Sequence, residues 1–338
     1  MTNKVALITG ITGMVGSHLL DYLYSNTDWD IHGIYRWRSP LNNIQHHMHV
    51  INSGGRIKLH LGDITDIASL HPILSSVKPD YVFHLAAQSY PKTSFTSAQD
   101  TFATNIQGTE NVLSAVREHS PEAVVHVCSS SEVFGRVPKE FVPINEDCRF
   151  HPASPYAISK CGTDLIGRYY AEAYGINTQI TRMFTHTGPR RGDVFMESSF
   201  AKQIALIEKN YLPPVVKVGN LDSLRTIADV RDAVDAYYKI VTTDPVPGEY
   251  YNIGGSTSLT VKQVLEYLIS ISSRADITYE VDPGRLRPID ADLQVPDLTK
   301  FLGKVDWKPA FDAYQTLSDL MEYWRQQVHS YGNSFLQR

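Results

Sequence analysis

Two side chains with a spacing of four residues, Tyr156 and Lys160, are the first candidates for chemistry in this sequence. On a helix, that spacing places both side chains on the same face. A neighbouring ammonium group favours the phenolate form of a tyrosine and lowers a pKa that is ordinarily near ~10. Lowering the pKa by roughly three requires about 4 kcal/mol of additional interaction with the phenolate. We therefore expect a second positive charge to stabilise the phenolate together with the lysine. The pair is typical of proton transfer to and from a hydroxyl group.

A polar run, Ser129-Ser130-Ser131-Glu132, directly follows an apolar segment at 123–128. In a parallel sheet the carboxyl ends of the strands form the edge where ligands bind. We expect Ser130 to hydrogen-bond the reacting oxygen. Glu132 is a candidate base for a carbon-bound proton, which the elimination of water beside a ketone requires and simple dehydrogenation does not. The alternative is a carboxylate at a helix N-terminus or on the surface.

Three glycines, Gly10, Gly13 and Gly16, separate the apolar segment 5–9 from a helical pattern. Glycines at this spacing allow a tight turn and the close approach of a pyrophosphate to the helix N-terminus. The alternative is an ordinary strand-to-helix turn. The segment predicts a nicotinamide dinucleotide site, whose oxidised ring would supply the second positive charge beside the tyrosine. The residues expected to contact the cofactor here are Gly10, Thr12, Gly13, Met14, Val15 and Gly16.

The end of the second predicted strand carries Arg36 where an NAD enzyme usually has an acidic residue. Because arginine offers a fork of donors to a ribose 2′-phosphate, the sequence predicts NADP. The alternative is a basic loop that faces solvent or a neighbouring subunit. Asp63 and Ile64 after the third strand are expected near the adenine. Residues Leu85, Ala86 and Ala87 after the fourth strand are expected beside the phosphates and the nicotinamide ribose.

The elements that must position these side chains alternate along the sequence between short apolar segments and amphipathic helical segments. This alternation is typical of a parallel sheet. The sequence predicts an α/β fold with a doubly wound, Rossmann-type parallel sheet and a smaller C-terminal α/β substrate lobe. We assign 1–184 to the cofactor domain and 185–338 mainly to the lobe, with some segments returning to the sheet. The predicted strands are 5–9, 30–35, 57–61, 81–85, 123–128 and 178–182, and the predicted helices are 15–24, 101–118, 155–174, 260–272 and 314–328.

The composition is that of an ordinary globular protein: 338 residues, 42% hydrophobic and 20% charged, with a formal charge of −5. This charge gives no general attraction to nucleic acid or anionic lipid. We expect no membrane segment, no signal peptide and a cytoplasmic location. Three cysteines without a CxxC pair predict reduced thiols. The histidines at 46, 47 and 49 have no carboxylate or thiol nearby in the sequence, so we expect a solvated loop and no metal site.

Over essentially its whole length the sequence resembles the extended short-chain dehydrogenase/reductase superfamily, and within it the GDP-mannose 4,6-dehydratase family. The resemblance rests on shared motifs along the chain. They are the glycine triplet, Arg36–Ser39, Gly62-Asp63, His84–Ser89, Ser130–Glu132, Ser154–Lys160, Gly188–Gly192, Val218–Asp222, Asp229–Asp232, Arg287-Pro288 and Trp307–Pro309.

The resemblance implies a role for each matching residue. Catalysis would belong to Ser130, Glu132, Tyr156 and Lys160. Cofactor contacts would include Arg36, Tyr156, Lys160, His186 and Arg191. Substrate contacts would include Ser89, Thr185, Lys202, Val218, Arg225, Arg287 and Asp290. The resemblance also places Arg36–Ser39 near the cofactor of a partner subunit, which implies a homo-oligomer, either a dimer or a tetramer.

Several positions depart from the family pattern and leave alternatives open. Ser130, Thr185 and the segment Arg225-Thr226-Ile227 differ from the usual residues of the family, so the hexose could be mannose, a heptose or an N-acetylhexosamine. The leading prediction is a GDP-sugar 4,6-dehydratase, which Asp292 weakly favours. The alternatives are a reductase or epimerase of GDP-4-keto-6-deoxy-sugars, and a non-catalytic NADP sensor. The intact Tyr156/Lys160 pair argues against a sensor.

Overall fold

Short apolar segments form a parallel sheet in the computed structural model, which describes residues 3–286, 289 and 291–337. Among these residues seven strands lie in the order β10-β6-β5-β4-β1-β2-β3, and all neighbouring pairs are parallel. The strand order reverses between β1 and β4, as in doubly wound dinucleotide-binding sheets, and the predicted fold class is confirmed. The strands are β1 (Val5–Thr9), β2 (Asp30–Tyr35), β3 (Ile57–Leu61), β4 (Tyr81–His84), β5 (Val124–Cys128), β6 (Asn177–Met183) and β10 (Glu249–Ile253).

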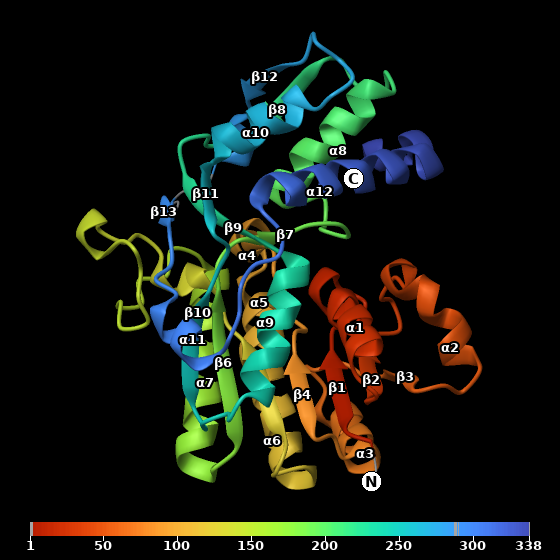
Figure 1. Cartoon of the computed structure of the whole chain (residues 1–338), viewed down its shortest axis with the longest axis vertical. Helices are drawn as coiled ribbons and strands as arrows, with labels where there is room; N and C mark the ends of the chain where they lie inside the picture. Colours follow the sequence, from red (N-terminus) through yellow and green to blue (C-terminus); the bar gives the residue numbers. More distant parts are fainter. Residues whose placement is uncertain (1–2, 287–288, 290, 338) are drawn as a thin grey trace.

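Helices cover both faces of this sheet (Figure 1). Successive side chains of a strand point to opposite faces, and both faces are apolar here because both are covered. In β1, Ala6 and Ile8 pack with the helices α1 and α9, whereas Leu7 packs with α3, α6 and α7. The helices are α1 (Met14–Asn26) and α9 (Val230–Thr242) on one face, and α3 (Ile67–Val77), α6 (Gly108–His119) and α7 (Pro155–Tyr174) on the other.

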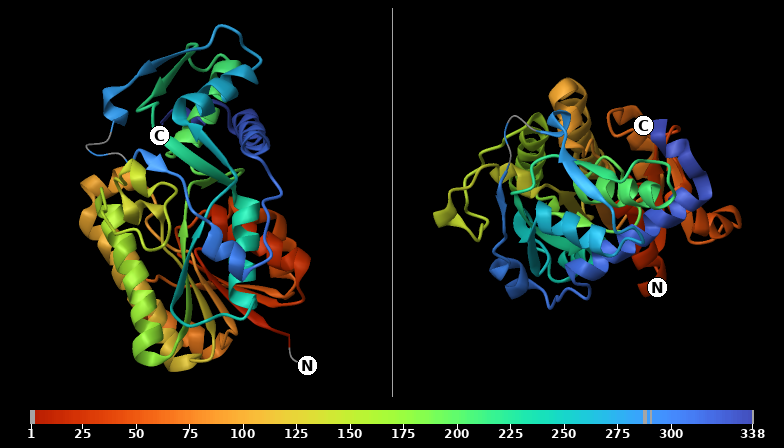
Figure 2. Two further views of the ribbon diagram at one scale, coloured as in Figure 1. Left: turned by 60° about the vertical axis from the view of Figure 1, so that its left-hand side comes forward. Right: turned by 90° about the horizontal axis from the view of Figure 1, so that it is seen from above.

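A second, smaller lobe lies beyond the carboxyl ends of the strands (Figures 1 and 2). Its own apolar core joins three helices to short strands. These elements are α8 (Met196–Glu208), α10 (Val261–Ser270), α12 (Ala313–Tyr331), β7 (His186–Thr187), β8 (Val215–Val218), β9 (Leu224–Asp229), β11 (Thr257–Thr260), β12 (Thr278–Val281) and β13 (Leu293–Gln294). Shorter elements connect them to the body. They are η1 (Asn42–His47), α2 (Met48–Asn52), α4 (Pro91–Thr96), α5 (Ala98–Phe102), η2 (Ala103–Gln107), η3 (Ser131–Phe134), η4 (Lys139–Phe141), η5 (Pro283–Arg285), α11 (Thr299–Lys304) and η6 (Gly332–Gln337).

The chain returns from the lobe to the sheet after residue 184. Helix α9 packs against α1, and β10 extends the sheet beside β6. Residues 185–338 therefore contribute to both parts of the molecule, and the carboxyl ends of the strands face the lobe.

One predicted helix, 101–118, is wrong as a single element. The segment divides into α5, a π-helical turn at η2, and α6. The side chain of Asn105 in this turn exchanges hydrogen bonds with the backbone of Gln88 and donates to Ser159 Oγ. These hydrogen bonds accompany the π-helical turn, a feature that frequently occurs at functional sites.

The expectation of a solvated histidine loop is also wrong for His47, which is buried in η1. Asp21 of α1 supplies the carboxylate that we did not find in the nearby sequence, because it lies 25 residues before His46. Its Oδ1 contacts Nε2 of His46 and of His47, each at 2.7 Å.

Two further observations concern membrane-spanning helices and the cysteines. Among the described residues, no helix is long and apolar enough to cross a membrane. The three cysteines are free thiols.

Candidate active site

The turn between β1 and α1 requires glycine at two positions. Gly10 has a φ of 72°, and a Cβ atom there would lie 2.9 Å from Cα of Ala86. A Cβ atom on Gly16 would collide with the carbonyl oxygen of Gly10. Gly13 occupies the N-cap position of α1, where no side chain caps the helix. The first N–H groups of α1 and its dipole are therefore available to a pyrophosphate that contacts residues 10–16.

Residues 85–87 lie beside this turn, and Asp63 and Ile64 lie in the loop after β3. The hydroxyl of Thr9 accepts hydrogen bonds from the N–H groups of Leu85 and Ala86, each at 3.1 Å, which holds residues 85–87 beside Gly10. Asp63 accepts from both the N–H and the hydroxyl of Thr65, which orders the loop before the buried Ile64.

Arg36 is exposed directly after β2, and its backbone N–H donates to Ser39 Oγ at 3.2 Å. The neighbouring Arg38 and Trp37 are exposed as well. No carboxylate occupies residues 36–39. The loop after β2 therefore offers exposed guanidinium groups and no acidic side chain.

Tyr156 and Lys160 lie in the first turns of α7, as predicted. Ser154 caps this helix by accepting from the N–H of Ala157, and Pro155 occupies the first position. Lys160 is 5% exposed, and its Nζ donates to the carbonyl oxygen of Cys128 at 2.7 Å. The ammonium group is thereby fixed at the carboxyl end of β5.

The expected low pKa of Tyr156 is not found in the protein alone. Burial raises the pKa of this tyrosine, and the charge of Glu132 acts in the same direction. A hydrogen bond with Ser130 and the charge of Arg191 oppose the increase without overcoming it. Lys160 donates to the Cys128 carbonyl oxygen and is not among the main influences on the pKa of Tyr156. A phenolate at neutral pH thus requires an additional positive charge in the site.

Glu132 lies next to this tyrosine, in the first turn of η3. Its backbone N–H donates to Ser130 Oγ at 3.2 Å, so the strand end fixes both residues. The side chain is partly exposed, and its charge acts on the Tyr156 hydroxyl. A carboxylate is therefore held near a tyrosine–serine pair, which is the arrangement needed for two proton transfers on neighbouring atoms of one substrate.

Two predicted residues reach the site from the segment that follows β6: His186 begins β7, and Arg191 lies in the loop after β7. The guanidinium of Arg191 stacks on Phe195, 3.4 Å from the ring centroid, and its charge acts on Tyr156. Arg191 Nε lies 3.6 Å from Glu197 Oε1. Burial, helped by the charge of Arg191, lowers the pKa of His186 to about 3. His186 is therefore neutral at physiological pH and can accept or donate a hydrogen bond.

Among the predicted substrate residues, Lys202 and Arg225 already have protein partners. Lys202 Nζ donates to Asp193 Oδ2 at 2.8 Å. The guanidinium of Arg225 donates to the carbonyl oxygens of Leu224 and Ala291. Both cations belong to the lobe, on α8 and β9, and could still present further donors to a diphosphate.

The remaining predicted substrate residues differ in how much of each side chain a ligand could reach. Ser89 is exposed after β4, and Thr185 is partly buried before β7, where its carbonyl oxygen accepts from the N–H of Ala228. Val218 has its side chain in the core of the lobe, so only its backbone is available to a ligand. Arg287 and Asp290 lie outside the described residues.

The sequence prediction missed an aromatic contact between the two parts of the molecule. The rings of Tyr90 and Phe195 lie edge to face with centroids 5.7 Å apart. Tyr90 follows the motif His84–Ser89, and Phe195 is the N-cap residue directly before α8. Glu197 was missed as well, because nothing in the sequence links an acidic residue of a helical first turn to Arg191.

Comparisons with known proteins agree with this geometry. The family model for GDP-mannose 4,6 dehydratase matches residues 7–320. A GDP-mannose 4,6 dehydratase of Drosophila melanogaster is 33% identical over 345 residues, covering 95% of this chain and 86% of the relative. A GDP-mannose 4,6-dehydratase of Vibrio cholerae serotype O1 is 31% identical, covering 98% and 96%.

Solved structures share the whole fold. RMD from Pseudomonas aeruginosa, complexed with NADPH, superposes with a TM-score of 0.82 and 25% identity over 96% of this chain and 100% of that one. A dTDP-glucose 4,6-dehydratase from Bacillus anthracis, in complex with NAD, has the same TM-score at 21% identity, over 96% and 98%, and supports the fold. The family match extends over both the glycine turn and the serine–glutamate–tyrosine site. The chain belongs to the GDP-mannose 4,6-dehydratase family.

Proposed function

We propose that this protein is a 4,6-dehydratase that converts a GDP-sugar into its 4-keto-6-deoxy derivative. The relatives named above, at about the same length, are GDP-mannose 4,6-dehydratases. The observation that carries the proposal is the position of Glu132 beside Ser130 and Tyr156 at the carboxyl end of β5. An oxidoreductase without an elimination step needs the tyrosine but has no need of this carboxylate.

The cofactor in this proposal is a nicotinamide dinucleotide, held by residues 10–16 and 85–87. The chain fits such a group because the glycine turn closes only without Cβ atoms and leaves the N-terminus of α1 open. When bound, such a cofactor would supply the acceptor for the hydride of sugar C4 and the source of the same hydride for C6. Its oxidised ring also provides the positive charge that Tyr156 lacks.

The residues divide the proton transfers between them. Tyr156 takes the proton of the C4 hydroxyl group, while Ser130 holds that oxygen. The C4 ketone then acidifies the proton on C5, which Glu132 removes. A double bond forms between C5 and C6 as the C6 hydroxyl group takes the proton from Glu132 and leaves as water. After hydride has returned to C6, C5 takes up a proton from solvent and Tyr156 releases the proton that it accepted. Lys160, fixed on the Cys128 carbonyl, can hold the ribose beside the tyrosine.

Mass spectrometry of the product tests this function. The enzyme is incubated with GDP-mannose and with GDP-linked heptose and N-acetylhexosamine, since Thr185 and Thr226 depart from the family pattern near the hexose. Loss of one water without net consumption of cofactor identifies a dehydratase and its sugar. Failure to dehydrate any GDP-sugar would contradict the proposal.

The same experiment separates the alternatives. A reductase of 4-keto-6-deoxy sugars uses the same Ser130, Tyr156 and Lys160, but it consumes one reduced cofactor for each product and releases no water. An epimerase changes neither the mass nor the net amount of cofactor. A sensor binds the cofactor and gives no product.

NADP is the finer proposal for the cofactor. Because a guanidinium–phosphate contact is charge-assisted, Arg36→Ala should weaken NADP binding by about tenfold or more and leave NAD binding nearly unchanged. Arg38→Ala is the matched control, since Arg38 is exposed in the same loop. Fluorescence titration of the cofactor-free protein measures the affinities for NADP and NAD. Equal affinity of the unmodified protein for NAD and NADP would exclude this role of Arg36.

We also propose that the protein is a homo-oligomer, either a dimer or a tetramer. The support is the loop at 36–39, in which the exposed Trp37 and two arginines project beside the cofactor site. Light scattering after gel filtration determines the mass, and a monomer would rule the proposal out.

A further inference from the structure

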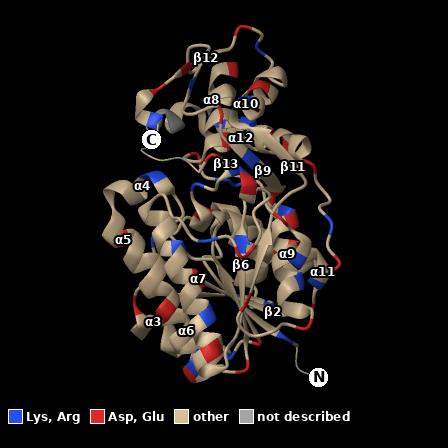
Figure 3. Cartoon of the chain, turned by 90° about the vertical axis from the view of Figure 1, so that its left-hand side faces the viewer, with Lys and Arg blue, Asp and Glu red and all other residues tan. Residues whose placement is uncertain are grey.

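Two histidines and a glutamate meet where α3 lies beside α6, at the end of the molecule away from the lobe (Figures 1 and 3). Nδ1 of His71, on α3, lies 2.9 Å from Nε2 of His119, the last residue of α6. Oε2 of Glu118 lies 3.6 Å from Nδ1 of His71, and Oε1 of the same carboxylate lies 3.7 Å from Nε2 of His119. Three potential metal ligands thus converge from two helices.

These distances match the geometry of a tetrahedral metal ion. Zinc binds histidine nitrogen and carboxylate oxygen at about 2.0–2.2 Å, so two ligand atoms on one ion lie about 3.3 Å apart. The three separations here, 2.9, 3.6 and 3.7 Å, are distributed around that value. Small rotations of the side chains would direct the two ring nitrogens and one oxygen of the Glu118 carboxylate to one ion. Two imidazoles and one carboxylate are also a donor set that suits Zn²⁺.

The surroundings of the cluster leave access for an ion. The side chains of His71, Glu118 and His119 are 32%, 62% and 20% exposed, so one side of the triangle faces solvent. The cluster takes no part in the proposed reaction. His119 precedes the amino end of β5, whereas Ser130 and Glu132 follow the carboxyl end of that strand.

A second group of the same composition, Asp21 with His46 and His47, is less suited to a cation. Both histidines contact a single carboxylate oxygen, Oδ1 of Asp21. The guanidinium of Arg190 occupies the other oxygen at 2.8 Å. This positive charge already compensates the carboxylate and would repel an incoming cation. Among the described residues, no lysine or arginine side chain is found in contact with the group formed by His71, Glu118 and His119.

We propose that His71, Glu118 and His119 form a surface site for one divalent transition-metal ion, with Zn²⁺ as the best fit and water in the fourth position. The ion would link the middle of α3 to the end of α6. Because it binds only where these two helices are packed, it would also stabilise the folded chain by mass action.

Calorimetric titration of the metal-free, untagged protein with Zn²⁺ tests the site. We expect one ion per chain in the unmodified protein. The double variant His71→Gln/His119→Gln should bind at least about tenfold more weakly, and Glu118→Gln should show a smaller loss. The matched control is His46→Gln/His49→Gln, which removes two exposed histidines from the other histidine-rich segment and should bind normally.

Thermal unfolding provides an independent measurement. Zn²⁺ should raise the melting temperature of the unmodified protein and of the control, but not that of the double variant. Circular dichroism verifies that each variant is folded, and the exposed Glu118→Gln change serves if the double variant is not. Absence of stoichiometric binding, unchanged binding in the folded variants, or loss of binding in the control would overturn the proposal.

Discussion

The hydroxyl of Tyr156 is subject to opposing influences that define its role. Burial and the charge of Glu132 favour the protonated form, while Ser130 and Arg191 favour the phenolate. The protein therefore keeps the tyrosine neutral until a further positive charge is present. This arrangement would couple proton acceptance by Tyr156 to the presence of an oxidised nicotinamide, because only that state of the cofactor carries the charge.

Replacing this tyrosine should separate catalysis from binding. Tyr156→Phe removes only the oxygen that accepts the proton and retains the ring that packs in the site. We expect loss of turnover by about 10²-fold or more, as for removal of a general acid–base group, with cofactor affinity within a few-fold of the original. Steady-state kinetics and cofactor titration measure the two quantities. Near-normal turnover would remove Tyr156 from the mechanism.

Glu132 gives the sharper test, because it distinguishes elimination from plain oxidoreduction. Glu132→Gln keeps the shape of the side chain and still permits oxidation at C4. The second proton transfer should then be slow, so product formation falls by about 10²–10⁴ while reduced cofactor accumulates on the enzyme. Rapid-mixing absorbance follows the reduced cofactor, and product analysis follows the sugar.

Solvent deuterium provides the control for this prediction. The unmodified enzyme should place deuterium at C5 during turnover, and the Gln variant should do so far more slowly. Product without deuterium at C5, or dehydration at the normal rate by the variant, would show that Glu132 is a structural carboxylate.

At the scale of elements, the two central strands carry histidines in the interior. His84 ends β4, His126 lies in β5, and burial lowers the pKa of each to about 3. Both are thus neutral in the folded protein and titrate near 6.5 in the unfolded chain. Their contribution to stability is complete above pH 6.5 and is lost as the pH falls from 6.5 towards 3.

The expected result is a folded state that weakens in mild acid. Between pH 6.5 and 5, each buried imidazole should reduce the free energy of unfolding by roughly 2 kcal/mol. The glutamine of His126→Gln cannot gain a proton. Between pH 6.5 and 5, this variant should therefore lose roughly 2 kcal/mol less stability than the unmodified protein. His329→Gln, which removes an exposed histidine, should behave like the unmodified protein. Urea unfolding at both pH values measures the difference, and identical pH dependence of the two variants would contradict the assignment.

The sequence predicted the elements whose signals are local. The glycine triplet, the apolar strands and the Ser154–Pro155 start of α7 each depend on neighbouring residues, and all appear in the structure. The π-helical turn in 103–107 was not predictable, because it accompanies contacts of Asn105 with Gln88 and Ser159. The sequence predicted that some segments of 185–338 return to the sheet, but that these segments are α9 and β10 depends on tertiary packing.

The same distinction applies to the candidate site. Gly10 and Gly16 have the geometry that their spacing predicts, and Tyr156 and Lys160 share one helix as expected. The direction of the Lys160 ammonium towards the Cys128 carbonyl was not predictable. Spacing places a side chain on a face of a helix but does not show which acceptor lies opposite.

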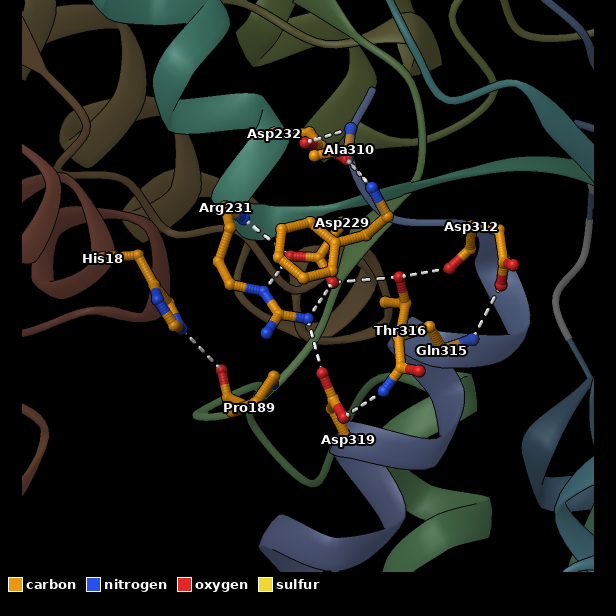
Figure 4. A network of polar contacts seen from close by, with 11 residues as sticks. His18, Pro189, Asp229, Arg231, Asp232, Ala310, Asp312, Gln315, Thr316 and Asp319 are labelled. Carbon is orange, nitrogen blue, oxygen red and sulfur yellow. Dashed lines mark hydrogen bonds and ion pairs between the residues drawn. The ribbon is translucent and has the colours of Figure 1, made fainter. Parts of the chain in front are cut away.

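At the scale of the whole molecule, polar contacts hold the lobe to the sheet. A polar network connects the start of α9, on the sheet, with α12 of the lobe (Figure 4). Asp229 caps α9 by accepting from the N–H of Arg231, and it also accepts from the hydroxyl of Thr316 on α12 at 2.9 Å. The guanidinium of Arg231 bridges Asp229 and Asp319 at 2.7 and 2.6 Å. The network therefore fixes the two parts that supply the active site.

The two acids of this network should differ strongly in their effect on stability, which makes them a matched pair. The side chain of Asp229 is 0% exposed and that of Asp319 is 28% exposed. Asp229→Ala removes the cap of α9 and a buried acceptor shared by Arg231 and Thr316, which keep only Asp319 and the Asp312 carbonyl oxygen, and should lower the free energy of unfolding by about 2–3 kcal/mol. Asp319→Ala removes a partner at the solvent boundary and should cost about 1 kcal/mol or less. The midpoint of urea unfolding measures both. If Asp319→Ala were the more damaging change, the junction would depend on its exposed rim, and the buried Asp229 could not be the residue that holds the lobe over the carboxyl ends of the strands.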